Sequence, residues 1–236
     1  MMSVSIKSVE IKGDIPKSIL QNISFEMDKG CVYTILGKNG SGKSTLISGL
    51  IKLLDENIYS VEAEIRFSGK NIYNLSTAEL LRLRKEKIRY VFQDSVNSFD
   101  HLKKFDYYFK MLNTPEEEIA NLFEYFLLPG KDKLLNLYPY EVSGGMAQRI
   151  SISLAILTKP VLLILDEPTS AIDINISNLL CRKLREFVKD NSSSVLLITQ
   201  DLDFAENVSD YMANMDKGIL SKFYKTSEYK KNMSQN

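Results

Sequence analysis

The segment ILGKNGSGKST, residues 35–45, constrains the fold of this chain more than any other feature. It matches the pattern G-x-x-x-x-G-K-[ST], and it stands between an apolar, strand-like run and an amphipathic helical pattern. Glycines in such a segment let backbone N–H groups curl around phosphate oxygens at the positive end of the following helix. A mere Gly-rich turn is the alternative, but the full match in this context favours a phosphate-binding loop.

The side chains of this loop have separable roles. Lys43 would reach the β- and γ-phosphates of a nucleotide, and the Ser44 hydroxyl would hold Mg²⁺. The sequence therefore predicts that the chain binds a nucleotide together with Mg²⁺. The residues expected around the phosphates are Gly37, Lys38, Asn39, Gly40, Ser41, Gly42, Lys43, Ser44 and Thr45.

A second motif, VLLILDEP, occupies residues 161–168. Its apolar run predicts a strand buried on both faces, and that strand ends in two carboxylates. Asp166 would hold the Mg²⁺ shell, and Glu167 would orient or deprotonate an attacking water. The alternative is a helix N-cap followed by an acid that favours the helix dipole. The phosphate-binding loop in the same chain makes the metal-and-base interpretation the stronger one.

Another apolar run, residues 195–198, ends abruptly in Thr199-Gln200-Asp201. Open α/β sheets place their chemistry at the carboxyl ends of such strands. A glutamine amide can donate a hydrogen bond to a phosphate oxygen, although it cannot take up a proton. The strand end therefore makes Gln200 a candidate for the catalytic site of Lys43 and Glu167, a question that the residues alone leave open.

Strands and helices alternate over much of the chain, which argues for a parallel sheet with helices packed on it. The prediction is one α/β domain over residues 1–225, with a helical subdomain inserted at about 95–158. The polar tail, residues 226–236, is expected to fray. Strands are expected around residues 4–11, 32–36, 65–67, 88–92, 161–165 and 195–198, with a β pair turning at 217–218.

The segment YEVSGGMAQRISISLAIL, residues 140–157, places Ser143, Gly144 and Gly145 at the start of a helix. A hydroxyl and two glycines at a helix N-terminus can form an anion site. In isolation an N-cap and turn is the better interpretation. Its position shortly before the VLLILDE strand favours the anion site instead.

Composition limits the partners of the chain. Lys and Arg number 30, as do Asp and Glu, so bulk charge gives no reason to expect nucleic-acid binding. No window approaches an uncharged membrane-spanning length, and we expect a soluble protein that reaches a membrane only through partners. Cys31 and Cys181 lie far apart without metal-ligand spacing, which favours a reduced, intracellular protein.

Over nearly its whole length the chain resembles the ATP-binding cassette ATPases. Their motifs stand here in the same order and spacing, as GKNGSGKST, FQD with Gln93, VSGGM, LILDE, SAID with Asp173, and ITQD. The resemblance implies a P-loop NTPase core with a mostly parallel sheet, an antiparallel β subdomain and an inserted α-helical subdomain. It also implies ATP and Mg²⁺ as cofactors, with Gln93 near the metal beside Ser44 and Asp166.

In this family two cassettes pair head to tail, so the P-loop of one and the signature of the other enclose each ATP. The resemblance implies that Ser143, Gly144, Gly145 and Met146 serve ATP bound to a second ATPase subunit, and a heterodimer is expected. Two transmembrane permeases and, indirectly, an extracytoplasmic solute-binding protein are the other partners it implies. The chain would lie at the cytoplasmic face of the cell membrane, with the aromatic run FDYYF either in the core or against a permease.

A narrower likeness connects the chain to the importer ATPases for oligopeptides, dipeptides and nickel. It rests on NIYNLSTAELLRLRKEKIRYVFQDSVNSFD and on YPYEVSGGMAQRISISLAI, where Met146 replaces the usual signature glutamine. The sequence stops soon after the expected final β pair, which favours a nickel or metal-chelate importer over a peptide importer.

Two positions depart from the family. An aromatic residue usually stands near Gly13 to stack on adenine, and SVEIKGDIPKSIL offers none. Gln200 occupies the place of the switch histidine, while the only histidine, His101, is remote in sequence. Losing one positioned donor costs about 10²–10³ in turnover, and a conservative replacement should lose less. Two hypotheses follow: an ATPase motor, and a nucleotide-binding structural subunit that hydrolyses little ATP at its own site.

Overall fold

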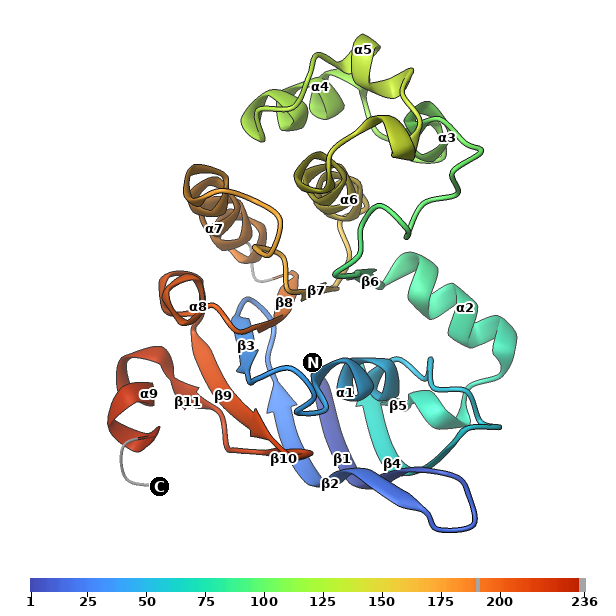
Figure 1. Ribbon diagram of the computed structural model, residues 1–236, viewed down its shortest axis with the longest axis vertical. Coiled ribbons are helices and arrows are strands. Elements are labelled where there is room, and N and C mark those ends of the chain that lie inside the picture. The colour runs from blue at the N-terminus through green and yellow to red at the C-terminus, as the bar shows by residue number, and fades with distance from the viewer. Residues whose placement is uncertain (190–191, 234–236) are drawn as a thin grey trace.

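The computed structural model describes residues 1–189 and 192–233, and Figure 1 shows the arrangement of their helices and strands. The strands are β1 (Met2–Ile11), β2 (Lys17–Met27), β3 (Val32–Leu36), β4 (Tyr59–Phe67), β5 (Lys70–Asn71), β6 (Ile88–Val91), β7 (Leu162–Asp166), β8 (Ser194–Thr199), β9 (Tyr211–Asp216), β10 (Ile219–Leu220) and β11 (Tyr224–Lys225). The helices are α1 (Lys43–Leu50), α2 (Thr77–Glu86), α3 (Phe105–Lys110), α4 (Glu116–Tyr125), α5 (Lys131–Leu135), α6 (Gly144–Leu157), α7 (Ile174–Val188), α8 (Leu202–Val208) and α9 (Thr226–Met233), with 3-10 turns η1 (Ile72–Asn74) and η2 (Pro139–Glu141).

The larger sheet brings the sequence motifs together. Its strands lie in the order β10-β9-β3-β8-β7-β6, with β11 paired to β9. The strands from β9 to β6 are parallel, which confirms the predicted parallel sheet. In its register Leu36 faces Thr199, and Asp166 faces Ile198. The segments that follow β3, β7 and β8 therefore leave the same edge of the sheet side by side.

The central strands separate two hydrophobic cores. Ile164 and Leu196 face the core that contains α1 and the smaller sheet. Their neighbours Leu165 and Leu197 face the opposite core, which contains residues of α6 and α7. Because both faces are buried, these strands are apolar throughout, as a parallel sheet covered by helices requires.

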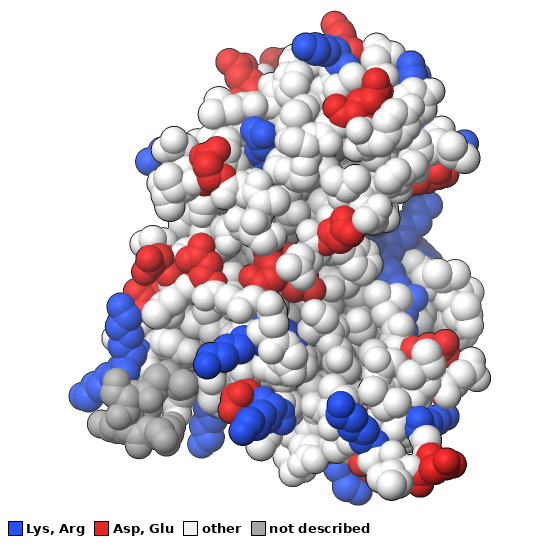
Figure 2. Space-filling view, in the orientation of Figure 1, with Lys and Arg blue, Asp and Glu red and all other residues white. Residues whose placement is uncertain are grey.

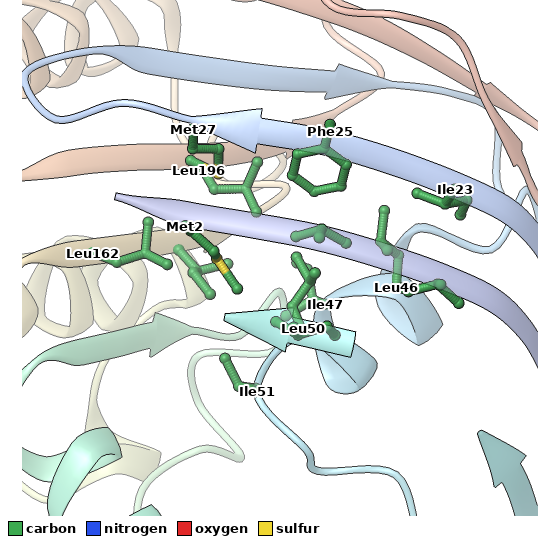
Figure 3. Close-up of a cluster of buried hydrophobic side chains, with 14 of the residues drawn as sticks. Met2, Ile23, Phe25, Met27, Leu46, Ile47, Leu50, Ile51, Leu162 and Leu196 are labelled. Atoms are coloured by element: carbon green, nitrogen blue, oxygen red, sulfur yellow. The ribbon is translucent and has the colours of Figure 1, made fainter. Parts of the chain in front are cut away.

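The smaller sheet is antiparallel and has the strand order β2-β1-β4-β5. Helix α1 packs between this sheet and the central one, and Figure 3 shows Leu46 and Ile47 of α1 among the side chains of both. Full burial of each such side chain stabilises the fold by about 1.5–3 kcal/mol. The phosphate-binding loop is thus anchored by a helix that is itself enclosed by apolar surface.

Strand β2 is the main element that the sequence does not predict. Its buried residues Leu20 and Ile23 are separated by two exposed residues, so the period-2 alternation is interrupted in mid-strand. Asn22, between them, has a left-handed backbone with φ +49°. The pairing with β1 also shifts register between Val9 and Glu10, which marks a bulge.

Helices α3 to α6 lie in the interval where helical character is predicted, and Figure 1 shows α3, α4 and α5 gathered beyond α6, away from the smaller sheet. That residues 95–158 form a separate subdomain stays a prediction. Helix α2 begins with a capping box, in which Ser76 and Glu79 exchange hydrogen bonds.

The prediction of a frayed tail is wrong for residues 226–233, which form helix α9. Tyr229 is buried there in a small cluster with Leu36 and Met212. The Thr226 hydroxyl donates to the carbonyl of Ser209 at 2.8 Å. A buried aromatic ring, hydrogen bonds from Thr226 and an ion pair between Lys230 and Glu206 thus hold a segment whose composition is otherwise polar. Residues 234–236 lie outside the described residues.

On the face drawn in Figure 2, acidic side chains gather across the middle of the molecule, and most Lys and Arg side chains lie in the lower half or at the right-hand margin. Among the described helices, none has the length and apolar character needed to cross a membrane.

Candidate nucleotide-binding site

The P-loop connects β3 to α1 through residues with left-handed backbone, Gly40 at φ +77° and Gly42 at φ +107°. A Cβ on Gly37 would come within 2.5 Å of the carbonyl oxygen of Met215, so the loop lies directly against β9. Ser41 is buried, and its Oγ has no hydrogen-bond partner among the described residues. A buried hydroxyl without a partner at a helix N-terminus fits a loop whose polar groups are completed by phosphate.

Lys43 is held at the centre of the loop. It is 6% exposed, and its Nζ donates to the carbonyls of Gly37 at 2.6 Å and Lys38 at 3.0 Å. The same nitrogen lies 3.7 Å from Glu167 Oε1. Lys38 and Asn39 are exposed on the outer side of the loop. The buried ammonium group is therefore aimed at the space that phosphates would occupy.

Asp166 ends β7 with its carboxylate buried beside α1. Its Oδ2 accepts hydrogen bonds from Ser44 Oγ at 3.3 Å and from the Tyr90 hydroxyl at 3.0 Å. Burial raises the pKa of Asp166, and the hydrogen bond from Tyr90 opposes that rise. A carboxylate and a hydroxyl this close are the oxygen donors that Mg²⁺ prefers, the rest of its shell coming from water and phosphate.

Glu167 follows immediately and is also buried. Its backbone is left-handed, with φ +46°, which is unusual for a residue other than Gly, Asn or Asp. Its N–H donates to the carbonyl of Ile198 at 2.8 Å, and its Oε2 accepts from the N–H of Gln200 at 3.1 Å. This conformation turns the carboxylate toward Lys43 rather than along the strand.

Gln200 lies at this site, as the strand-end argument predicts. It is exposed, and its Nε2 donates to Asn39 Oδ1 at 2.8 Å and to Glu167 Oε1 at 3.4 Å. The amide therefore bridges the P-loop and the acidic strand end. A donor in this place is able to face a terminal phosphate and the water beside it.

Gln93 is exposed in the loop after β6. It borders a cavity of about 610 Å³ that is also lined by Ser44, Asp166 and Gly144. Two residues that the sequence analysis did not single out, Tyr90 and Gln148, line the same cavity. Gln148 is buried and accepts from Ser95 Oγ at 2.6 Å, while its Nε2 has no partner within the described part of the chain.

The sequence carried weak signals for both of these residues. Tyr90 stands on a strand that precedes Gln93, and a tyrosine in a short β run is usually read as core. Gln148 lies one helical turn after Gly144, on the side of α6 that faces the cavity. Neither residue type has a motif of its own, so only the three-dimensional arrangement identifies them.

In the signature segment, residues 142–146, Ser143 and Gly144 are exposed, and Gly144 borders the cavity that Ser44 and Asp166 also line. Ser143 caps α6 by accepting from the N–H of Met146 at 3.2 Å. A Cβ on Gly145 would meet the carbonyl oxygen of Ala171 at 2.5 Å, so this glycine permits close packing against the loop before α7. Asp173 caps α7, accepting from the N–H groups of residues 175 and 176. Within this chain, Ser143 and Asp173 both act as helix caps.

A family model described as ABC transporter matches residues 20–170, which include the P-loop, the signature and both strand-end acids. The chain therefore belongs to the ABC transporter family, and the class that its fold and motifs define is that of the ATP-hydrolysing transport ATPases.

Similar proteins include the oligopeptide transport ATP-binding protein OppD of Haemophilus influenzae, 30% identical over 91% of this chain and 70% of the relative. OppD of Bacillus subtilis is 33% identical over 85% of this chain and 59% of the relative. The dipeptide transport ATP-binding protein DppD of Lactococcus lactis subsp. cremoris is 30% identical over 89% of this chain and 63% of the relative. The chain thus spans between 59% and 70% of the length of these relatives.

Solved structures give the same fold. The ATP-binding cassette MJ0796, in a dimeric post-hydrolysis state bound to ADP and Pi, matches with a TM-score of 0.81 at 20% identity, over 96% of this chain and 99% of that one. The structure of cbiO1 from Clostridium perfringens, which is part of the ABC transporter complex cbiONQ, matches with a TM-score of 0.76 at 23% identity. The match covers 98% of this chain and 92% of that one. At these identities the likeness establishes the α/β cassette fold.

Proposed function

We propose that this chain is the ATP-binding and ATP-hydrolysing subunit of an importer for a small solute. The observation that carries the proposal is the meeting of Lys43, Glu167 and Gln200 at one edge of the sheet, with Nζ 3.7 Å from Glu167 Oε1 and the Gln200 amide on the same carboxylate. Lys43 would neutralise phosphate charge, Glu167 would polarise the attacking water, and Gln200 would donate to the γ-phosphate.

Mg²⁺ fits the donors of this site. Ser44 and Asp166 supply a hydroxyl and a carboxylate oxygen, and Gln93 borders the same cavity. Mg²⁺ keeps several waters and takes phosphate oxygens, so it needs few protein ligands. The bound ion would neutralise charge on the β- and γ-phosphates, while Ser44 and Asp166 hold its shell in place.

The exposed signature supports a paired arrangement. Ser143 and Gly144 are exposed at the N-terminus of α6, whose backbone N–H groups favour an anion. We propose that these residues, with Gly145 and Met146, complete the ATP site of a second ATPase subunit, and that Asp173 lies at the same junction. A heterodimer would allow one site to differ from the other, as the substitution at Gln200 suggests.

A groove on the other side of Phe92 supports a permease contact. Its volume is about 540 Å³, and it is lined by apolar and basic side chains that include Arg89, Phe99 and Tyr108. In the run FDYYF the two phenylalanines are buried, whereas Tyr108 faces this groove. We propose that a segment of a transmembrane permease docks here, with the chain at the cytoplasmic face of the membrane and a solute-binding protein acting on the far side.

For the transported solute we propose a chemical class, namely a peptide. The relatives described above are named for oligopeptide and dipeptide transport, which favours a peptide over nickel or a metal chelate. A nucleotide-binding structural subunit is the second candidate, because the Gln200 amide is bonded to Asn39 and brings no titratable group to the γ-phosphate.

Isolation of the full chain from its native membranes tests this proposal. The Glu167→Gln variant, with ATP and Mg²⁺ present, should hold the assembled state and bring down a second ATPase subunit and two permeases, with bound solute identified by mass spectrometry. Lys43→Ala, isolated in the same way, is the control for ATP-dependent assembly. Recovery of the chain without any membrane protein would contradict the importer function.

A further inference from the structure

Tyr90 is the one aromatic side chain that donates a hydrogen bond to the strand-end acids among the described residues. Its hydroxyl lies 3.0 Å from Asp166 Oδ2, the oxygen that also accepts from Ser44 at 3.3 Å. A carboxylate oxygen only accepts hydrogen bonds, so the Tyr90 hydroxyl is the donor in this contact. A buried carboxylate with two fixed donors on one oxygen has a fixed orientation.

The ring of Tyr90 is held in turn by its neighbour on β6. The rings of Tyr90 and Phe92 are 4.1 Å apart at the centroids, with an interplanar angle of 43°. Both residues line the cavity that holds Ser44 and Asp166, and both line the groove on the other side. The pair therefore forms the wall that separates the two hollows.

We propose that Tyr90 is a positioning residue for Mg²⁺: its hydroxyl orients the Asp166 carboxylate so that the remaining oxygen lone pairs face the metal beside Ser44. This inference rests on the proposed function, since it concerns the same site. Groups that orient a metal-binding side chain typically contribute about 10–100-fold to metal affinity. The Tyr90 hydroxyl bonds to Asp166, whereas the phosphates would bind at Lys43 and the P-loop backbone, so loss of the hydroxyl should not affect nucleotide binding without metal.

The test uses the full chain with AMP-PNP, which is not hydrolysed, and Mn²⁺ as a paramagnetic probe of the Mg²⁺ site. Mn²⁺ affinity of the nucleotide complex is measured by electron paramagnetic resonance, and AMP-PNP affinity is measured separately in EDTA. Tyr90→Phe keeps the ring against Phe92 and deletes only the hydroxyl. The matched control is Tyr125→Phe, which removes a hydroxyl that donates at the same 3.0 Å distance to the carbonyl of Leu179, remote from the site.

We expect Tyr90→Phe to weaken Mn²⁺ binding by about tenfold or more, to broaden the Mn²⁺ signal, and to leave AMP-PNP affinity in EDTA unchanged. Wild-type Mn²⁺ affinity in Tyr90→Phe, or an equal loss in Tyr125→Phe, would overturn the positioning role while leaving the proposed function intact. Failure of the wild-type chain to bind AMP-PNP at all would overturn both.

Discussion

The two halves of the candidate site differ in how completely the chain itself builds them. In the P-loop half, Lys43, Asp166 and Glu167 are buried, and each has partners within the chain. In the signature half, Ser143 and Gly144 are exposed and serve only to begin α6. The first half is organised before any ligand or partner arrives.

This difference between the two halves assigns nucleotide binding and ATP hydrolysis to different requirements. A pre-organised P-loop half can take up nucleotide with little rearrangement, because its charges and backbone are already positioned. Under the proposed function, the exposed signature residues act on ATP only once a second subunit is present. Nucleotide binding to the P-loop half should therefore be measurable on the chain alone, whereas ATP turnover has to be measured on the assembled complex.

The largest effect is expected for Glu167→Gln. Loss of the general base should lower steady-state ATP turnover of the assembled complex by about 10²–10⁴, with ATP binding intact and the closed state prolonged. The measurement compares turnover with retention of radiolabelled ATP, and Asp203→Asn, at an exposed position of α8, is the control for loss of a nearby charge. Weakened ATP binding in Glu167→Gln would point instead to a purely structural acid.

Lys43→Ala comes next and should act on the isolated chain. Removing a buried, hydrogen-bonded cation opposite phosphate costs about 3 kcal/mol, which corresponds to about 100-fold in ATP affinity. Equilibrium binding of a fluorescent ATP analogue measures this loss. Lys38→Ala removes an exposed lysine from the same loop and should change affinity little; equal affinities for the two variants would remove the assigned role of Lys43.

Gly145→Ala tests the signature half through packing. Its Cβ would approach the carbonyl oxygen of Ala171 to 2.5 Å, so we expect a loss of about 1–3 kcal/mol in the free energy of unfolding. Gly144→Ala is the matched control, because the nearest atom to its Cβ is 4.0 Å away. Chemical denaturation of the isolated chain measures both, and identical midpoints would show that the segment before α7 moves aside freely.

The smallest effect is expected at Gln200. Gln200→His should raise turnover of the full complex several-fold and Gln200→Ala should lower it several-fold, and both changes are smaller than the factor of about 10²–10³ typical for complete loss of a well-placed donor. Steady-state ATPase rates of the assembled complex decide between the two hypotheses. Equal ATPase rates for the wild type and both Gln200 variants would favour a nucleotide-binding structural subunit, because turnover would then come from the partner's site.

The sequence predicts the P-loop half well, because its functional residues lie in short contiguous motifs or directly at strand ends. The P-loop is one contiguous segment, and Asp166 and Gln200 each end an apolar run, so parallel strand ends bring them together. The sequence does not predict roles for Tyr90 and Gln148, because these roles depend on which face of β6 or α6 lies against the cavity. The bulged strand β2 was hidden for a different reason, since a break in alternation removes the signal that identifies strands.

Gly218 has a consequence for synthesis of the protein on the ribosome. Its N–H donates to the carbonyl of Ser41 at 2.9 Å, its carbonyl accepts from Gln21 at 3.1 Å, and a Cβ there would meet Ile19 at 2.1 Å. The P-loop lies near the N-terminus of the chain, and the turn that completes it lies near the C-terminus. A nascent chain cannot make this contact until residue 218 has emerged, so we expect ATP to stabilise the nearly complete domain more than the early folding intermediates.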